Sequence, residues 1–426
     1  MEKELLYAQV QESPAVSVEG IQEAAKRLKD VAAHTPLTYS HTLSKKFQCQ
    51  VFLKREDLQV VRSYKLRGAY NMLSTLPSEQ LEKGVVCASA GNHAQGFAFS
   101  CRKLNVHGVV FMPVVTPKQK INQTKMFGEG YITVELVGDT YDDCAAAAKK
   151  YTTEKGMTFI PPFDNPYIIE GQGTVAMEIL EEQSAIDYLF VPVGGGGLCA
   201  GVGTYFKAFS PETQIIGLEP QGAPSMFKAM QAGHPVTLDQ IERFVDGAAV
   251  KRVGDLTFKI CKDVLSDMHL VPEGKVCSTI LKLYNEDAIV VEPAGALSIA
   301  SLDDYAETIK GKKIVCVVSG SNNDIARMEE IKERSLEFEG LKHYFILRLA
   351  QRPGALKEFV NNVLGENDDI TRFEYLQKNN KETSPALVGI ELKRREDYHT
   401  LLQKLDYYGF NYTVLKNNDN LVGFLV

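Results

Sequence analysis

The chain has 426 residues, of which 44% are hydrophobic and 24% are charged, and its formal net charge is −7. Because this length exceeds what one hydrophobic core usually supports, two or three domains are expected. The composition is that of a globular protein, and an acidic chain without a basic patch lacks the electrostatic footprint of nucleic-acid binding, so we expect a small-molecule substrate.

The cysteines and the start of the chain give further expectations. The eight cysteines form neither a CxxC pair nor a zinc-type cluster, so reduced, buried thiols and no metal site are expected. The start, Met1-Glu2-Lys3-Glu4, has no signal-peptide pattern, and the longest apolar stretch, near Val109 to Val115, is too short to cross about 30 Å of hydrocarbon. A cytoplasmic protein without a membrane partner is expected.

Short apolar runs alternate with helical patterns along the first 320 residues. Strands are predicted at Val51–Leu53, Val85–Ala88, Val106–Met112, Tyr188–Val193, Gln214–Leu218 and Lys313–Val318, and helices from about Leu66, Asn92 and Pro117. This order predicts βαβ units on parallel sheets, arranged as two open α/β lobes. Since ligands bind beyond the carboxyl ends of such strands, the polar and glycine-rich motifs that follow these runs are expected to meet at one crevice.

Four consecutive glycines, Gly194, Gly195, Gly196 and Gly197, separate the run 188–193 from a predicted helix at Leu198–Phe209. Bare backbone followed by a helix N-terminus favours an anion such as a phosphate. The motif is neither a P-loop nor GxGxxG, so a nucleoside triphosphate or a dinucleotide is not expected. The alternative is a flexible turn.

Four ordered motifs together resemble the serine/threonine dehydratase group of pyridoxal-phosphate enzymes over about residues 20 to 335. The motifs are Arg62-Ser63-Tyr64-Lys65-Leu66-Arg67-Gly68-Ala69-Tyr70-Asn71, Ser89-Ala90-Gly91-Asn92-His93-Ala94-Gln95-Gly96, Gly194-Gly195-Gly196-Gly197 and Ser319-Gly320-Ser321-Asn322. The resemblance implies the two-lobed tryptophan synthase β-like α/β fold and pyridoxal 5'-phosphate as cofactor.

The same resemblance implies roles for single residues. Lys65 would hold the cofactor aldehyde as a Schiff base and then act as the base at the substrate Cα. Without the flanking motif, the alternative interpretation is a surface lysine ahead of a helix. Asn92 would bind the 3-hydroxyl oxygen of the cofactor ring. The phosphate would be bound by the backbone N–H groups of Gly194, Gly195, Gly196, Gly197 and Leu198. The substrate carboxylate would face Ser89, Ala90, Gly91, Asn92 and His93, with a loop-shaping role as the alternative for His93.

Ser319 follows the apolar run 313–318, where the resemblance places the pyridine nitrogen. A hydroxyl does not protonate that nitrogen as a carboxylic acid would, so β-elimination is favoured over transamination. Two other segments resemble family loops. Glu292-Pro293-Ala294-Gly295-Ala296 is similar to a loop near the active site, whereas the segment from Glu219 lacks, at Ser225, the second carboxylate of cation-binding relatives, so no metal is expected.

A charged stretch at 329–340 marks the expected boundary between a catalytic domain, 1–335, and a regulatory domain, 340–426. Strands are predicted at Tyr344–Leu349, Ile370–Gln377, Leu387–Leu392, Tyr412–Leu415 and Leu421–Val426, with helices at Gly354–Val363 and Glu396–Asp406. This βαββαβ order suits a ferredoxin-like, ACT-like α+β module. Residues 351–356 and 368–375 resemble the regulatory tail of threonine dehydratases, which implies feedback inhibition by isoleucine; a purely oligomeric module is the alternative.

Taken together, the resemblance implies deamination of L-threonine to 2-oxobutanoate and ammonia, the entry to isoleucine synthesis, by a homo-oligomer with a tetramer favoured. A serine dehydratase or racemase, a β-replacement enzyme and a non-catalytic amino-acid sensor are the alternatives. The sequence does not rank threonine above serine, since one methyl group is worth only about 1 to 3 kcal/mol. It also does not identify the effector as isoleucine or valine, or distinguish a tetramer from a dimer.

Overall fold

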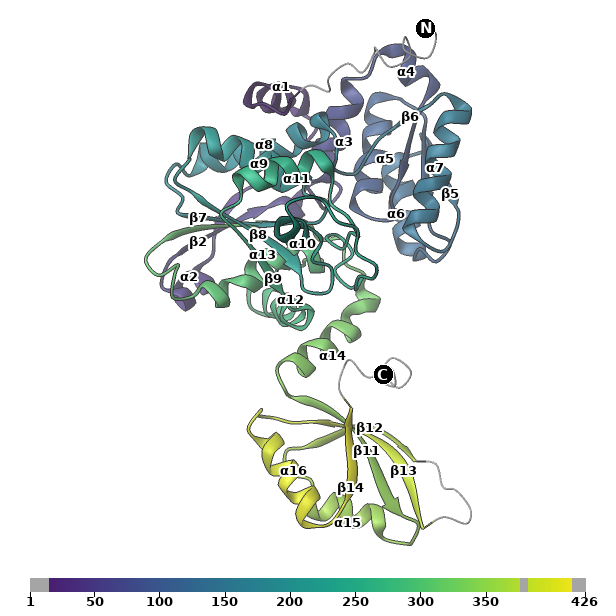
Figure 1. Ribbon diagram of the computed structural model, residues 1–426, viewed down its shortest axis with the longest axis vertical. Coiled ribbons are helices and arrows are strands. Elements are labelled where there is room, and N and C mark those ends of the chain that lie inside the picture. The colour runs from purple at the N-terminus through teal and green to yellow at the C-terminus, as the bar shows by residue number, and fades with distance from the viewer. Residues whose placement is uncertain (1–14, 376–381, 416–426) are drawn as a thin grey trace. The chain divides into compact units, whose positions relative to one another are not determined.

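The computed structural model describes residues 15–375 and 382–415. The chain divides into two compact units, Met1–Ile325 and Ala326–Val426. The first unit contains two α/β lobes, each built on its own sheet (Figure 1). The predicted domain limits at 335 and 340 stay a prediction.

The larger lobe is built on a six-stranded sheet with the order β1-β2-β10-β7-β8-β9. Its strands are β1 (Leu37–Tyr39), β2 (Gln50–Arg55), β7 (Tyr188–Pro192), β8 (Gln214–Pro220), β9 (Asp267–Val271) and β10 (Lys313–Val318). All neighbours are parallel except β1, which is antiparallel to β2. The prediction that the runs at 51–53, 188–193, 214–218 and 313–318 form parallel strands is confirmed.

Helices cover both faces of this sheet. In Figure 1, α8 (Pro166–Glu182) and α9 (Gly197–Phe209) lie above it, and α2 (His41–Phe47) and α12 (Glu273–Asp287) lie below it. The lobe also contains α1 (Val18–Leu28), α10 (Ser225–Ala232), α11 (Asp255–Val264) and α13 (Pro293–Ala300). Burial on both faces explains why the strands read as continuous apolar runs rather than as alternating ones.

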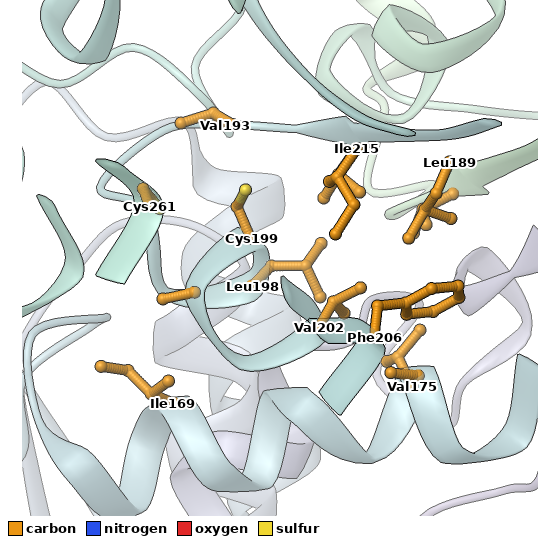
Figure 2. Packing of buried hydrophobic residues seen from close by; sticks show 14 of the residues in the cluster. Ile169, Val175, Leu189, Val193, Leu198, Cys199, Val202, Phe206, Ile215 and Cys261 are labelled. Atoms are coloured by element: carbon orange, nitrogen blue, oxygen red, sulfur yellow. The ribbon is translucent and has the colours of Figure 1, made fainter. Parts of the chain in front are cut away.

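The core between the sheet and its upper helices fixes the end of the glycine-rich loop. Figure 2 shows Leu189 and Ile215 of the strands facing Val202 and Phe206 of α9. Leu198, in the first turn of α9, belongs to the same cluster and is 2% exposed. The loop is therefore held between a buried strand and a buried helix start.

The smaller lobe has a four-stranded parallel sheet with the order β5-β4-β3-β6. Its elements are β3 (Val85–Ala88), β4 (Gly108–Met112), β5 (Ile132–Leu136), β6 (Thr158–Phe159), α4 (Ser78–Lys83), α5 (Asn92–Leu104), α6 (Lys118–Gly128) and α7 (Tyr141–Lys155). Val110 of β4 packs with α5, whereas Val109 and Phe111 pack with α7, so both faces are covered. The strand predicted at 85–88 is confirmed at its predicted bounds.

Helix α3 (Lys65–Ser74) packs against α5 of the smaller lobe and α8 of the larger one. Glycines allow both approaches. A Cβ on Gly96 would lie 2.9 Å from the backbone nitrogen of Leu66, and a Cβ on Gly171 would lie 2.5 Å from the carbonyl oxygen of Arg67. The motif around Lys65 therefore lies where the two lobes meet.

The second unit is an antiparallel sheet with the order β12-β13-β11-β14. Its elements are α14 (Met328–Phe338), β11 (Lys342–Ala350), α15 (Ala355–Asn362), β12 (Asp369–Tyr375), β13 (Thr383–Glu391), α16 (Asp397–Tyr407) and β14 (Asn411–Leu415). Alternate residues of β11, including Phe345 and Leu347, form a core with α15 and α16. The predicted ferredoxin-like βαββαβ order is confirmed. The strand predicted at Leu421–Val426 and the last two residues of the strand predicted at Ile370–Gln377 lie outside the described residues.

All eight cysteines are buried and none of them forms a disulfide, as predicted. Within residues 15–375 and 382–415, no helix is long and apolar enough to span a bilayer.

Candidate active site

Lys65 is the first residue of α3, and its side chain is partly buried where the two lobes meet. Its Nζ donates a hydrogen bond to the carbonyl oxygen of Pro162 at 2.9 Å. Burial lowers the pKa of Lys65 to about 8, and the negative charge of Glu292 partly opposes this. A lysine with this pKa has a much larger neutral fraction near neutral pH than an ordinary lysine, and the neutral amine is the form that acts as a nucleophile or a base.

The connection from β6 to α8, residues 160–165, links the parts of the site. The carbonyl of Ile160 lies 3.0 Å from Nε2 of His93, the carbonyl of Pro162 accepts from Lys65, and the ring of Phe163 lies against Gly195. The sequence analysis missed this segment. A usable signal was present, because Pro161-Pro162 and then Asn165-Pro166 mark a turn followed by a helix start.

The glycine tetrad forms a bare backbone loop at the N-terminus of α9. Gly196 has φ of 95°, in the left-handed region, and precedes the helix as its cap. A Cβ on Gly195 would lie 2.2 Å from Cδ1 of Phe163, and a Cβ on Gly197 would lie 2.5 Å from Oε1 of Gln172. Because the first N–H groups of a helix have no partner within it, this loop can bind an anion.

Replacing Gly195 by alanine is expected to lower both stability and cofactor affinity. The added methyl group would overlap the ring of Phe163, and overpacking of this kind costs about 1 to 3 kcal/mol. The measurement is the thermal unfolding midpoint together with a pyridoxal-phosphate titration. Gly91→Ala is the matched control for stability, because its Cβ would meet nothing within 4 Å. Equal midpoints for the two variants would contradict the proposed packing of the loop.

The loop Ser89 to His93 follows the carboxyl end of β3, and α5 begins at Asn92 as predicted. The hydroxyl of Ser89 accepts from the backbone N–H of Gly91 at 3.3 Å. His93 is buried, and burial together with the charge of Lys65 lowers its pKa to about 3. Its imidazole is therefore neutral at physiological pH and hydrogen-bonds to the carbonyl of Ile160.

The segment after β10 runs beside the segment that precedes Lys65. The backbone N–H of Tyr64 donates to the carbonyl of Ser319 at 3.3 Å, and that of Ser321 donates to the carbonyl of Arg62 at 2.9 Å. Ser63 and Gly320 form an antiparallel bridge between these two pairs. Two motifs more than 250 residues apart therefore form one wall of the site.

Asn92 of the smaller lobe is hydrogen-bonded to two residues of the larger lobe. Its Nδ2 donates to Oε1 of Glu292 at 2.6 Å, and its Oδ1 accepts from Nδ2 of Asn322. The sequence analysis gave no role to the Glu292 carboxyl or to Asn322. The signal for Glu292 is a single acidic residue within the apolar run 289–296, which is typical of a buried carboxyl group.

Glu219, in the loop that resembles a cation site, has its carboxylate occupied by protein donors. It accepts from the backbone N–H groups of Met226 and Phe227 at 2.7 and 2.8 Å and from the hydroxyl of Ser225 at 3.2 Å. The carboxylate therefore caps the start of α10. In the described part of the chain, no cluster of three His, Cys, Asp or Glu side chains could hold a metal ion.

This arrangement of a lysine between two lobes, a glycine loop at a helix start and a two-lobed α/β body agrees with the comparisons with known proteins. Residues 28–320 match the pyridoxal-phosphate dependent enzyme family, and residues 333–425 match the C-terminal regulatory domain of threonine dehydratase. The biosynthetic L-threonine dehydratase IlvA of Halalkalibacterium halodurans is 56% identical over 412 residues, which are 96% of this chain and 99% of that protein. The chain belongs to the threonine dehydratase family of pyridoxal-phosphate dependent enzymes.

Solved structures of this family and its neighbours are also similar. The processed form of threonine deaminase isoform 2 from Solanum lycopersicum is 39% identical, with a TM-score of 0.71 over 76% of this chain and 96% of that one. Maize serine racemase is 30% identical, with a TM-score of 0.71 over 76% of this chain and 99% of that one. The catalytic body of the threonine dehydratase family is thus shared with racemases, so the body alone does not decide between the two reactions.

Proposed function

We propose that this protein converts L-threonine to 2-oxobutanoate and ammonia by β-elimination, as the first step of isoleucine synthesis. The observation that carries this is the amine of Lys65, which bonds to Pro162 next to Phe163, the residue that lies against the glycine loop, in a member of the threonine dehydratase family. The second unit favours threonine dehydratase over serine racemase, because it matches the regulatory domain of the former.

The residues present fit pyridoxal phosphate. The glycine loop leaves its backbone bare for a phosphate, and polar side-chain atoms of the motif before Lys65 and of α8 lack protein partners. The hydroxyl of Ser63 and both polar atoms of the Gln172 amide are buried without a hydrogen bond, and Gln172 lies against Gly197. Such atoms are costly unless a polar ligand satisfies them. In the proposed assignment Lys65, Asn92, Gly194, Gly195, Gly196, Gly197, Leu198 and Ser319 hold the cofactor.

The chain's own residues then divide the work of the reaction. When bound, pyridoxal phosphate supplies the sink for the electron pair left at the substrate Cα. Lys65 removes the Cα proton, because its lowered pKa leaves the amine partly neutral. The Ser89 hydroxyl and the N–H groups of the loop through Ala90, Gly91, Asn92 and His93 bind the substrate carboxylate. The Cα–H and Cβ–O bonds break, a Cα–Cβ double bond forms, and the β-hydroxyl leaves as water with a proton that balances the one taken by Lys65. The released enamine tautomerises to an imine, and its hydrolysis gives the 2-oxo acid and ammonia.

The regulatory and assembly properties are part of the same proposal. The second unit is the proposed isoleucine sensor, with a coupling to threonine turnover of about 1 to 3 kcal/mol. A homo-oligomer is proposed, with a tetramer favoured over a dimer. The biosynthetic relatives are the basis for placing the protein in the cytoplasm.

The test is release of 2-oxo acid from L-threonine by the full chain, with and without isoleucine. We expect turnover that falls about 5- to 150-fold at saturating isoleucine, as a coupling of this size implies. L-Serine and L-valine serve as the comparison substrate and effector. Turnover of serine alone would contradict the threonine assignment, and no response to isoleucine would contradict the sensor.

A further inference from the structure

We propose that Glu292 is a positioning residue for the reaction, because its carboxyl group orients the amide of Asn92 and places a negative charge beside Lys65. The inference deepens the proposed function and rests on it for its kinetic test. Glu292 lies directly before α13, and 3% of its surface is exposed.

The backbone and the surroundings of Glu292 hold its side chain in place. Its N–H donates to the carbonyl of Gly320 at 3.2 Å, and its own carbonyl accepts from Gly295 at 2.9 Å. Two glycines make room for its Oε1. A Cβ on Gly320 would lie 2.5 Å from this oxygen, and a Cβ on Gly247 would lie 3.3 Å from it. The carboxyl group makes no capping hydrogen bond to α13, so capping does not explain its presence.

The carboxylate decides how the amide of Asn92 is turned. A carboxylate only accepts hydrogen bonds, so Nδ2 of Asn92 must face it, at 2.6 Å. Oδ1 of Asn92 is thereby directed to Nδ2 of Asn322, which donates to it. One hydrogen of the Asn92 Nδ2 remains free for a ligand oxygen. A buried network of this kind gives its members one orientation only when every partner is present.

The charges around Glu292 come from three directions. Lys65 and Tyr64 face it from the start of α3, and its charge raises the pKa of both. Burial, helped by the charge of Asp246, raises the pKa of Glu292 to about 7, against the hydrogen bond from Asn92 and the charge of Lys120 of α6. Glu292 therefore changes charge near neutral pH. The ionised form is the better acceptor for Asn92 and the one that acts on Lys65.

The experiment compares wild type with Glu292→Gln over about pH 5.5 to 9, where kcat/KM reports groups of the free enzyme. Protonation of Lys65 should lower kcat/KM below about pH 8 in both proteins. Beyond that, we expect wild-type kcat/KM to fall more steeply as the pH drops through about 7, and the glutamine variant to lack this second fall, the acidic limb of Glu292. At pH 8 the variant should be roughly 10- to 100-fold slower, as expected for a misplaced binding group. A glutamine variant with the wild-type pH profile would overturn the proposal.

A second readout does not depend on turnover. The absorbance of the bound cofactor should show a transition near neutral pH in wild type and lose it in Glu292→Gln. If wild type bound the cofactor but did not consume threonine, the proposed function would fail while this titration still decided the role of Glu292. A transition that persists unchanged in the glutamine variant would refute that role.

Two further variants separate positioning from folding. Glu292→Asp keeps an ionisable group, so it should retain the acidic limb at a lower rate, and it remains informative if the glutamine variant does not fold. Glu219→Gln is the matched control, because Glu219 is another buried carboxyl group whose burial raises its pKa to about 7. It should leave the acidic limb in place. If Glu219→Gln lost this fall of kcat/KM, the titrating group would be Glu219 rather than Glu292, and the proposal would be contradicted.

Discussion

Lys65→Ala is expected to lower threonine turnover by at least about 10³-fold, within the range that a positioned acid-base group contributes. The variant lacks both the covalent attachment point for the cofactor and the amine that removes the Cα proton. Folding should survive, because burial disfavours the charged form of Lys65 and, within residues 15–375 and 382–415, its amine loses a single hydrogen bond, to the carbonyl of Pro162. The measurements are 2-oxobutanoate release and the thermal unfolding midpoint.

The matched control is Lys83→Ala. Lys83 is half-exposed and forms an i,i+4 pair with Glu79 on the surface of α4. Such a pair contributes little, so turnover and midpoint should both stay near wild type. Wild-type turnover by Lys65→Ala would refute the mechanism, whereas loss of activity together with unfolding would leave it undecided between chemistry and folding; the midpoint separates these outcomes.

The sequence predicted the parts of the site that follow local rules. The strand at 85–88 and the start of α5 at Asn92 lie where they were expected, because an apolar run followed by a polar, glycine-containing loop marks a parallel strand and the helix after it. The apolar run at 106–112 was read as a strand throughout. In the structure the strand starts at Gly108, because the N–H of Val106 bonds to the carbonyl of Cys101 and completes the end of α5.

The contacts between the lobes could not be read from local patterns. Residues 160–165 follow β6, the edge strand of the smaller sheet. Their contacts with His93, Lys65 and Gly195 depend on where the folded sheet places the end of β6. The carboxyl of Glu292 reaches Asn92 across 200 residues of chain. Each residue has an ordinary local role as well, in a turn or before a helix. Its role in the site therefore depends on tertiary pairing that periodicity does not encode.

Arg67→Met is expected to cause the largest loss of stability, about 3 to 5 kcal/mol, because it leaves buried carboxylates without their partner. Arg67 lies one residue after Leu66 in α3, and its side chain is 2% exposed. It donates to both oxygens of Glu56 at 2.8 Å and to both oxygens of Glu178 at 2.6 and 2.9 Å. Glu178 would keep the ion pair with Lys54 at 2.5 Å and the backbone N–H of Thr35 at 3.3 Å.

The loss should depend on pH in a defined direction. Burial opposes ionisation of Glu178, yet Arg67 and Lys54 outweigh it and lower the pKa of this carboxyl. A lowered pKa contributes stability that is present above the ordinary value and lost as the pH falls through the folded value. Without Arg67 the Glu178 carboxyl can relieve its burial by taking up a proton. The deficit of Arg67→Met should therefore be largest near neutral pH and shrink toward pH 5.

Thermal unfolding midpoints at neutral and acidic pH measure this deficit, with Arg102→Met as the matched control. Arg102 pairs with Glu129 on the surface, where that carboxylate is 64% exposed, so its loss should cost no more than about 1 kcal/mol. The network also joins α3 to η1 (Glu56–Leu58), β2 and α8, which fixes the helix that begins with Lys65. Arg67→Met should accordingly lose threonine turnover at temperatures below its own unfolding midpoint. A variant as stable and active as the control would show that the buried ion pairs do not hold Lys65 in place.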